Sequence, residues 1–320
     1  MRVLVTGGGG FLGQKLARAL AARGKLRGQD ISAMELVDLA APAAIEAPFP
    51  VTGTAADISD PAQVGALFAS KPDVVYHLAA VVSGAAEADL DLGLRVNLTG
   101  TLNLLQAARA AGNEPVVVYA SSWAVHGGDE PDPIHDGLEL NPQTSYGAQK
   151  AIGELLLNDF SRRGLIDGRG LRLPTVSIRP GKANAAASSF MSSIFRDPME
   201  GRPANCPVPR DFPVWHTAPR TVIGNLIYAA ELEGAAFGTN RCLNLPGRTD
   251  TIGEMIAAMT EVFGPEAEAR ITWETDPVIE TIVKGWRTAL VPGKGAALGF
   301  AADASFADSV RWFLEDDIRR

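Results

Sequence analysis

Cysteine and long hydrophobic runs are scarce in this sequence, and each shortage narrows the possible classes of protein. The 320 residues include two cysteines, Cys206 and Cys242, which are too few for a disulfide framework and lack the spacing of metal ligands. We therefore expect no metal site, and two small buried thiols in a reducing compartment. No apolar stretch reaches the ~18 residues of a membrane span, and the N-terminus lacks a signal-peptide pattern. Together these shortages predict a cytoplasmic protein without a membrane partner.

Positive charge is also in short supply. The chain carries 29 Lys and Arg against 37 Asp and Glu, for a formal net charge of −8 and a pI near 5.1. Phosphate backbones are bound by clustered positive charge, so this balance argues against nucleic acid as a partner. The hydrophobic content of 46% and the charged content of 21% are ordinary for a soluble globular enzyme. A chain of this length predicts one large domain or two modest ones.

A glycine-rich loop follows the first apolar run of the chain. The segment Thr6–Gly13 reads TGGGGFLG, and leucines at helical spacing come directly after it. Glycines let the backbone turn sharply and approach a pyrophosphate, while the N–H groups of the following helix attract that anion. Gly7, Gly10 and Gly13 fit the TGxxGxxG spacing. The loop also contains GxGxxG from Gly8, so spacing alone does not decide between the two versions. The order strand, glycine loop, helix predicts a dinucleotide site.

Acidic residues follow the next two apolar segments. The run Met34–Val37 ends in Asp38, where a carboxylate can accept hydrogen bonds from a ribose and repels a 2′-phosphate. NAD is therefore favoured over NADP, with a capping or loop role for Asp38 as the alternative. Asp57 and Ile58 follow the short segment that starts at Val51, and Asp57 could lie near the adenine or simply make a turn.

Strand-like and helix-like segments alternate through the first half of the chain. The apolar run Asp73–His77 ends in Leu78-Ala79-Ala80, whose small side chains leave room for a cofactor, and we expect His77 to pack at the strand end. Leu90–Gly112 predicts a long helix, and the run Val116–Ala120 leads into Ser121 and Ser122. This alternation predicts an α/β fold with a doubly wound parallel sheet of Rossmann type. Ligands bind such sheets at the carboxyl ends of the strands, where the glycine loop, Asp38 and Ser122 all fall.

Tyr146 and Lys150 are four residues apart and share one face of a predicted helix. An unperturbed phenol titrates near ~10 and is a poor base at neutral pH. A nearby ammonium should lower the pKa of Tyr146 and make it a usable general base. Ser122, 24 residues upstream, would hydrogen-bond the same substrate oxygen. Such a pair is common on exposed helices, but behind a glycine loop it predicts a hydride-transfer site.

The ordered motifs resemble the extended short-chain dehydrogenase/reductase superfamily, the NAD-dependent epimerase/dehydratase group, over nearly the whole chain. The resemblance rests on the glycine loop, His77-Leu78-Ala79-Ala80, Asn97–Thr101, Ala120-Ser121-Ser122, the Tyr146/Lys150 pair and Arg179-Pro180-Gly181. It implies that Ser122, Tyr146 and Lys150 are catalytic, and that Lys150 also holds the nicotinamide ribose. It further implies a homodimer built on the helices Leu90–Gly112 and Thr144–Gly164. The residues predicted to bind NAD are Gly7, Gly10, Phe11, Leu12, Gly13, Asp38, Asp57, Ile58, Leu78, Ala79, Ala80, Asn97, Tyr146 and Lys150.

The departures from the superfamily pattern bear on the substrate. Dehydratases of the group carry an Asp-Glu pair after the catalytic Ser or Thr, whereas this chain has Trp123-Ala124, so we do not expect sugar dehydration. His126 replaces the usual Tyr before Gly127, which leaves the local substrate contact open. The segments 179–190 and 215–220 resemble a narrower subgroup, the NAD-dependent D-erythronate dehydrogenases, which oxidise C2 of a four-carbon sugar acid.

A small anionic substrate needs a guanidinium or an ammonium for its carboxylate. Arg220 and Lys182 are the candidates, with Asn184, Ser188 and His216 as further donors to the carboxylate or the hydroxyls. For each of them a purely structural contact is the alternative, and His216 could instead orient Arg220.

The C-terminal part is expected to cover the substrate. From Gly181 onward prolines come in quick succession, as in stretches that usually cover a site, and the segment Thr251–Glu254 predicts a capping box. We predict an NAD-binding domain over residues 1–180 plus about 212–245. A small discontinuous substrate domain would take up about 181–211 and 246–320.

The predicted activity is NAD-dependent oxidation of C2 of D-erythronate to a 2-oxo-tetronate. Two alternatives stay open. One is a nucleotide-sugar (UDP-hexose) 4-epimerase that retains its NAD. The other is a non-catalytic NAD-sensing protein, which is disfavoured because Tyr146 and Lys150 are both intact.

Overall fold

The computed structural model describes all residues except 182–186, 278, 280–282, 284 and 319–320. The chain divides into two compact units. The first comprises Met1–Val125, Thr144–Arg172 and Ile223–Asn244, and the second comprises His126–Gln143, Leu173–Val222 and Leu245–Arg320. The predicted division also had two discontinuous parts, but it assigned residues 126–143 to the NAD-binding part. The binding roles expected of the two parts stay predictions.

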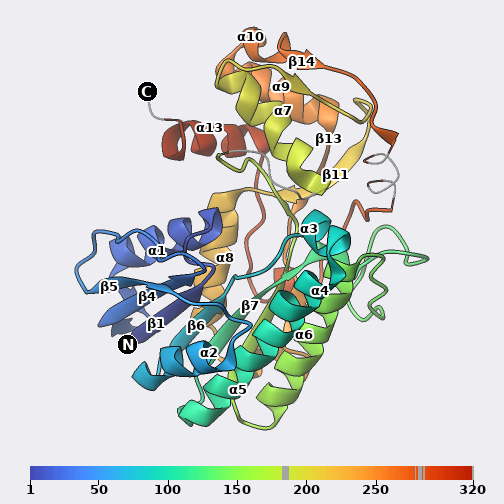
Figure 1. Ribbon diagram of the computed structural model, residues 1–320. Helices are drawn as coiled ribbons and strands as arrows, with labels where there is room; N and C mark the ends of the chain where they lie inside the picture. Colours follow the sequence, from blue (N-terminus) through green and yellow to red (C-terminus); the bar gives the residue numbers. More distant parts are fainter. Residues whose placement is uncertain (182–186, 278, 280–282, 284, 319–320) are drawn as a thin grey trace. The chain divides into compact units, whose positions relative to one another are not determined.

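The described residues of the first unit form a seven-stranded sheet (Figure 1). In spatial order its strands are β12 (Cys242–Asn244), β8 (Asp167–Leu173), β7 (Val116–Ser122), β6 (Val74–His77), β1 (Arg2–Thr6), β4 (Ala33–Asp38) and β5 (Val51–Ala55). The pairings of β1 with β4 and β6, β4 with β5, β6 with β7 and β8 with β12 are parallel. A strand covered on both faces is apolar along its whole length, and β1 and β7 are buried almost throughout. The predicted Rossmann-type parallel sheet is confirmed.

Helices cover both faces of this sheet. Figure 1 shows α2 (Pro61–Leu67), α5 (Thr101–Ala111) and α6 (Ser145–Arg162) along one face and α1 (Phe11–Arg23) on the other. Side chains before the first turn fix where two of them begin. Asp60 accepts hydrogen bonds from the first turn of α2, and Thr144 does the same for α6. The end of α1 is tied to the end of α8 (Pro219–Glu231) by an ion pair between Arg23 and Glu231. A short hairpin of β2 (Lys25–Leu26) and β3 (Gln29–Asp30) follows α1.

The predicted helix over Leu90–Gly112 is present but changes its winding. It starts as α4 (Leu90–Gly93), continues as a π-helical segment over Leu94–Gly100 and ends as α5. Gly112 ends it with a φ of 69°, a conformation that glycine adopts without strain. The preceding helix α3 covers Ser83–Ala88. π-Helical segments widen the helix and often occur at functional sites, and this one carries Asn97.

Each unit has its own hydrophobic core. In the first unit Val75, Val117, Leu104 and Leu157 join strands and helices in one buried cluster. In the second unit a separate cluster includes buried aromatic and methionine side chains such as Phe195. Burial of this kind stabilises each unit by roughly 25 cal/mol per Å² of apolar surface removed from water. None of the helices in the described residues combines the length and the hydrophobicity of a bilayer span.

The second unit is built from short strands and five helices in its described residues. β9 (Thr175–Val176) and β13 (Arg248–Thr251) flank β11 (Pro213–Thr217), and β10 (Ala204–Asn205) pairs with β14 (Ile271–Thr272). The helices are α7 (Phe190–Met199), α9 (Ile252–Phe263), α10 (Pro265–Glu268), α12 (Lys294–Ala297) and α13 (Phe306–Asp316). The predicted capping box is confirmed, because Thr251 and Glu254 bond each other's backbone N–H at the start of α9.

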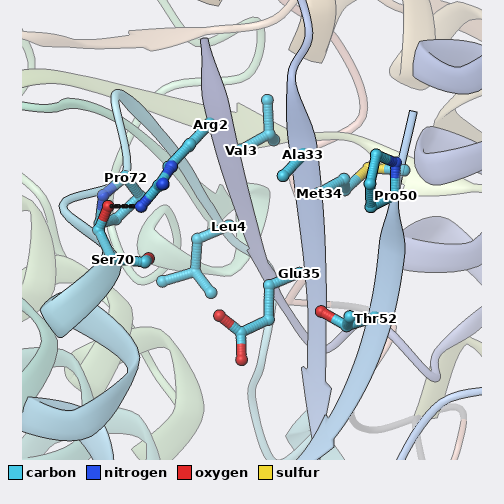
Figure 2. Close-up of a pocket in the computed structure, with 10 residues that line it drawn as sticks. All are labelled: Arg2, Val3, Leu4, Ala33, Met34, Glu35, Pro50, Thr52, Ser70 and Pro72. Carbon is cyan, nitrogen blue, oxygen red and sulfur yellow. Dashed lines mark hydrogen bonds between the residues drawn. The ribbon is translucent and has the colours of Figure 1, made fainter.

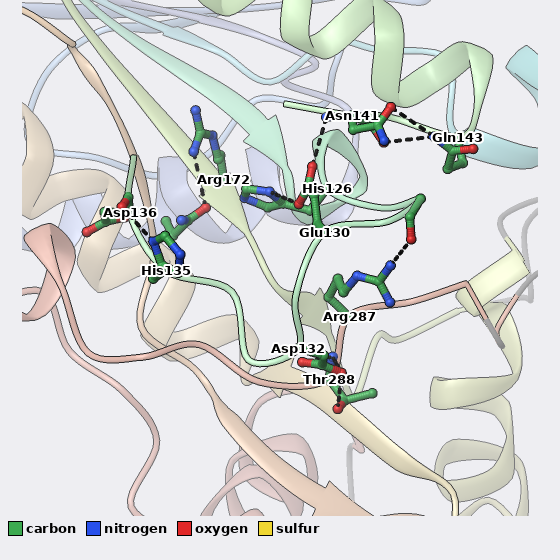
Figure 3. Close-up of polar contacts among 12 residues, drawn as sticks. His126, Glu130, Asp132, His135, Asp136, Asn141, Gln143, Arg172, Arg287 and Thr288 are labelled. Carbon is green, nitrogen blue, oxygen red and sulfur yellow. Dashed lines mark hydrogen bonds and ion pairs between the residues drawn. The ribbon is translucent and has the colours of Figure 1, made fainter. Parts of the chain in front are cut away.

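Residues 126–143 belong to the second unit, and the carboxylate of Asp132 fastens them to its C-terminal part (Figure 3). Asp132 accepts hydrogen bonds from Thr288 N at 3.0 Å, Thr288 Oγ1 at 2.7 Å and Ala289 N at 3.1 Å. Glu130 lies 2.9 Å from Nδ1 of His126 within the segment. Residues 126–143, which lie between Ser122 and Tyr146 in the sequence, are therefore tied to the C-terminal part of the second unit.

Candidate active site

The glycine loop leaves no room for side chains at two positions. Gly7 has a φ of 73°, and a Cβ added there would lie 2.7 Å from the backbone N of Ala79. A Cβ at Gly13 would lie 2.2 Å from the carbonyl oxygen of Gly7. No side chain caps α1, because Gly10 precedes it. The loop therefore keeps backbone N–H groups at the start of α1 clear for a pyrophosphate.

Asp38 lies beside this loop at the end of β4. Its carboxylate accepts hydrogen bonds from Gly9 N at 3.1 Å and Leu39 N at 2.8 Å. A carboxylate fixed next to the glycines is placed as the ribose of NAD requires. The carboxylate of Asp57 instead accepts from the N and Oγ of Ser59 at 2.8 and 2.7 Å, which is the turn that we considered as its alternative role. Its contact with the adenine, and that of Ile58, stay predictions.

Ser122, Tyr146 and Lys150 come together at the carboxyl edge of the sheet. Ser122 ends β7, and its side chain is hydrogen-bonded to the phenol of Tyr146. Lys150 is buried, and its Nζ donates to the carbonyl oxygen of Ala120 at 2.8 Å. The same Nζ lies 5.7 Å from the centre of the Tyr146 ring. The sequence motif and the fold thus assemble one hydroxyl, one phenol and one amine.

The acidity of this group differs from our expectation. Burial raises the pKa of Tyr146 to about 12, while the hydrogen bond with Ser122 acts in the opposite direction. The net shift of the pKa is upward, because the free energy lost by removing the phenolate from water exceeds the stabilisation from that hydrogen bond. The expected lowering of the Tyr146 pKa by Lys150 is therefore wrong for the protein alone. Burial also lowers the pKa of Lys150 to about 7, and Glu154 opposes that shift.

Asn97 and His77 form a buried network behind these residues. Asn97 accepts from Val81 N at 2.8 Å and donates to Gln149 Oε1 at 2.7 Å. It therefore ties the loop segment at Val81, after β6, to the helix turn of Lys150, and its predicted supporting role stays a prediction. His77 lies 2.7 Å from Thr6 Oγ1 and 3.0 Å from Thr101 Oγ1 and is buried, as we expected of a packed histidine.

Sequence reasoning missed a buried ion pair next to the candidate site. Glu154 accepts from Arg172 Nη2 at 2.7 Å and from Ser121 Oγ at 2.5 Å. Its position four residues after Lys150 was a signal that could have been used, because it places Glu154 on the same face of α6. The negative charge of Glu154 raises the pKa of Lys150 and so opposes the effect of burial.

Apart from Ser122 and Tyr146, no contact joins the predicted substrate residues to one another within the described part of the chain. Lys182 and Asn184 lie outside the described residues. His216 is buried with Nε2 2.9 Å from Asp250, and its role beside Arg220 stays a prediction. The guanidinium of Arg220 lies 2.8 Å from Glu315 and 2.5 Å from Asp316. A substrate carboxylate would have to displace one of these acids, and the binding role of Arg220 stays a prediction.

Ser188 has a different neighbour. Its carbonyl oxygen accepts from Arg179 Nη2 at 2.8 Å, and its Oγ lies 3.5 Å from the same nitrogen. Ser188 is therefore a predicted substrate residue that lies against the guanidinium of Arg179.

A pocket of about 190 Å³ lies elsewhere in the first unit (Figure 2). Its lining includes Arg2, Ala33 and Pro50, which lie at the amino ends of β1, β4 and β5. The glycine loop follows the carboxyl end of β1. This pocket is therefore at the opposite end of the strands from the candidate site.

Comparison with known proteins agrees with the fold and the motifs. The pattern of the NAD dependent epimerase/dehydratase family matches residues 3–218. D-erythronate dehydrogenase of Cupriavidus necator is 48% identical over 320 residues, covering 99% of this chain and 98% of that protein. D-erythronate dehydrogenase of Haemophilus influenzae is 39% identical over 318 residues, covering 99% and 100%.

Solved structures also agree with the observed fold. A nucleoside-diphosphate-sugar epimerase from Agrobacterium tumefaciens superposes with a TM-score of 0.95 at 43% identity, covering 99% of this chain and 94% of that one. A GalE-like L-threonine dehydrogenase from Cupriavidus necator, at 23% identity and a TM-score of 0.83 over 99% of both chains, shares the fold. The family uses NAD, and the glycine loop with Asp38 fits that cofactor. The predicted superfamily is confirmed, and this chain belongs to the NAD-dependent epimerase/dehydratase family.

Proposed function

We propose that this protein is an NAD-dependent dehydrogenase that oxidises C2 of D-erythronate to a 2-oxo-tetronate. The observation that carries the chemistry is the Ser122–Tyr146 hydrogen bond with the amine of Lys150 beside the phenol. The observation that supports the substrate is the full-length similarity to two proteins that bear the name D-erythronate dehydrogenase.

The proposed residues divide the reaction between them. Tyr146, in its phenolate form, accepts the proton of the substrate C2 hydroxyl, and Ser122 donates a hydrogen bond to the oxygen as it becomes a carbonyl. Lys150, anchored on Ala120 O, binds the nicotinamide ribose and supplies positive charge next to the phenol when it is protonated. NAD, when bound, supplies the acceptor for the hydride that leaves C2. The proton taken up by Tyr146 passes to water, so the reaction yields a 2-oxo acid, NADH and one proton.

One experiment separates the proposed function from its rivals. The purified protein is incubated with NAD and a panel of aldonic acids and UDP-sugars, while NADH absorbance and sugar interconversion are followed. We expect NADH with D-erythronate and none with the UDP-sugars. Interconversion of UDP-hexoses without net NADH would instead establish a 4-epimerase, which the family also includes. If the protein binds NAD but shows no activity in either assay, the result would favour a non-catalytic NAD-sensing protein.

We also propose a homodimer. Leu90 and Leu155 are 53% and 67% exposed on α4 and α6, and Leu94 and Ile152 on the same two helical stretches are partly exposed. The stretches pack side by side (Figure 1), so they form one apolar surface of the kind that a second subunit covers. The two buried thiols, which do not need an oxidising compartment, support a cytoplasmic location.

A further inference from the structure

Three residues of α6, each about one helical turn from the next, contact the last three residues of β7. The pairs are Tyr146 with Ser122, Lys150 with Ala120, and Glu154 with Ser121. Positions four residues apart share one face of a helix, so Glu154 continues the face that carries the proposed base and the amine. The proposed reaction uses the first two contacts and leaves the third without a role.

A neighbouring strand of the same unit also binds the Glu154 carboxylate. Arg172 of β8 donates to it from Nε at 2.9 Å and from Nη2 at 2.7 Å. Nη1 of Arg172 lies 3.4 Å from Asn244 Oδ1 of β12, and both members of the ion pair are buried. A buried ion pair often adds little stability compared with well-packed apolar residues. Its place against the strand end that bears Ser122 is therefore better explained by a role in the reaction than by stability.

The titratable rings that face Lys150 are uncharged at neutral pH. Nζ of Lys150 lies over the ring of Tyr119 on β7, 4.7 Å from its centre, and His77 of β6 stacks on that ring. Burial raises the pKa of Tyr119 well above its ordinary value, lowers that of His77 to about 3 and raises that of Tyr146 to about 12. The negative charge that acts on the amine comes from Glu154, which raises the pKa of Lys150.

We propose that Glu154 is a positioning residue for the reaction, which holds the end of β7 against α6 and supplies the negative charge that favours the ammonium of Lys150. The inference rests on the proposed function for the reaction in which Lys150 takes part. The ammonium in turn favours the phenolate of Tyr146. Between the pKa values of the two groups, the fraction of protein that carries both ions equals the acid constant of Tyr146 divided by that of Lys150. A more acidic Lys150 therefore leaves less protein in the reactive form.

The test is a titration of Lys150 that needs neither substrate nor NAD. Protein isotopically labelled at the ε-carbon of lysine is titrated by NMR, and Lys150→Met identifies the signal. Glu154→Gln removes the charge and keeps the shape, whereas Glu154→Asp keeps the charge. Glu231→Gln is the control, because it removes a carboxylate that is paired with Arg23 elsewhere in the first unit.

Loss of a nearby opposite charge should lower the pKa of Lys150 by about one unit in Glu154→Gln. Glu154→Asp should titrate closer to the wild type than Glu154→Gln does, and Glu231→Gln should titrate like the wild type. One pKa unit is a tenfold change in an acid constant, so kcat for D-erythronate should fall about 10-fold in Glu154→Gln. The KM for the acid should stay within about twofold.

A Lys150 pKa in Glu154→Gln that equals the wild-type value overturns the assignment, and so does an equal lowering in Glu231→Gln. If circular dichroism shows that Glu154→Gln is unfolded, Arg172→Met decides. That variant removes the guanidinium that offsets the charge of Glu154, so the pKa of Lys150 should rise. An unchanged or lowered pKa in Arg172→Met counts against the proposal.

The titration also keeps this inference separate from the proposed reaction. If Glu154→Gln lowers the pKa of Lys150 but the wild type oxidises no acid, the role of Glu154 toward Lys150 stands and the proposed reaction fails. If the wild type oxidises D-erythronate and Lys150 titrates alike in both proteins, only the Glu154 assignment fails. Absence of both turnover and the pKa difference contradicts both.

Discussion

Single buried residues decide which charges are present in the candidate site. Lys150 has a pKa of about 7 because burial disfavours its ammonium, while Glu154 favours it. Its charge therefore changes in the range where the protein would work. Arg172 and Ser121 hold the Glu154 carboxylate in place, so the charge of Lys150 also depends on residues outside the proposed catalytic group.

Tyr146→Phe tests the proposed general base. Removal of the phenolic oxygen leaves no acceptor for the hydroxyl proton but keeps the ring beside Lys150. We expect turnover of D-erythronate to fall by at least ~10²-fold, within the usual contribution of acid–base catalysis, while NAD affinity measured by fluorescence stays near the wild-type value. Turnover within tenfold of the wild type would reject the assignment of Tyr146.

His77 should make folding stability depend on pH. Burial lowers its pKa from 6.5 to about 3, with the charge of Lys150 as a smaller cause. Above pH 6.5 both folded and unfolded chains hold a neutral His77, and its full contribution to stability is present. Between 6.5 and 3 only the unfolded chain takes up the proton, so the free energy of unfolding falls by up to ~1.4 kcal/mol per pH unit.

Urea unfolding of the wild type and His77→Gln at several pH values between 7.5 and 4.5 measures this dependence. The stability advantage of the wild type should shrink as the pH falls, since glutamine does not titrate. A constant difference would mean that His77 is protonated in the folded protein. The hydrogen bonds argue otherwise: Thr101 donates to Asn97 O, so it accepts from Nε2–H, and Nδ1 is left to accept from Thr6.

At the scale of elements, the strand–loop–helix unit at the N-terminus could be predicted in full from the sequence. Its constraints are local, because glycine is the residue that a sharp turn and a close backbone approach require. The long helix was also predictable, but its π-helical segment was not, since no simple residue pattern marks that change of winding. The carboxylates that form ion pairs with Arg220 belong to α13, which is far from Arg220 in the sequence. Contacts of that kind depend on tertiary packing that one sequence does not reveal.

Gly13→Ala tests the glycine loop. The added Cβ would lie 2.2 Å from Gly7 O and 2.8 Å from Gly8 Cα, and backbone atoms cannot yield as a flexible side chain can. We expect a loss of roughly 1–3 kcal/mol in the free energy of unfolding and at least ~10-fold weaker NAD binding by calorimetry. Gly65→Ala is the matched control, because its Cβ meets no heavy atom within 4 Å in the interior of α2. That variant should bind NAD normally and gain up to ~1 kcal/mol.

The exposed surface of α4 and α6 carries a prediction about assembly. Leu155→Glu places a charge on the proposed interface and should convert the dimer to a monomer, because burying an unpaired carboxylate is unfavourable. Light scattering after gel filtration measures the mass, which should fall from twice the 33.7 kDa of one chain to that value. Val291→Glu, at a position 45% exposed in the second unit, should leave the dimer intact. A wild type that runs as a monomer contradicts the proposal.

At the scale of the whole molecule, the sequence predicted two parts but not where the chain passes between them. The alternation of strands and helices indicates a parallel sheet wherever it occurs, so the first unit was readily predicted. Residues 126–143 lie between two segments of that unit, and contacts such as those of Asp132 with Thr288 and Ala289 show that they belong to the other. The predicted substrate residues were the least certain part, because ion pairs such as those of Arg220 with Glu315 and Asp316 join segments far apart in the sequence.

The path of the chain also limits how a protein of this kind can evolve. The chain passes from one unit to the other five times, after residues 125, 143, 172, 222 and 244. No single cut in the gene separates the two units, so recombination at one point cannot exchange one of them as a block. An exchange of the whole second unit would instead need a recombination point at each of these five crossings.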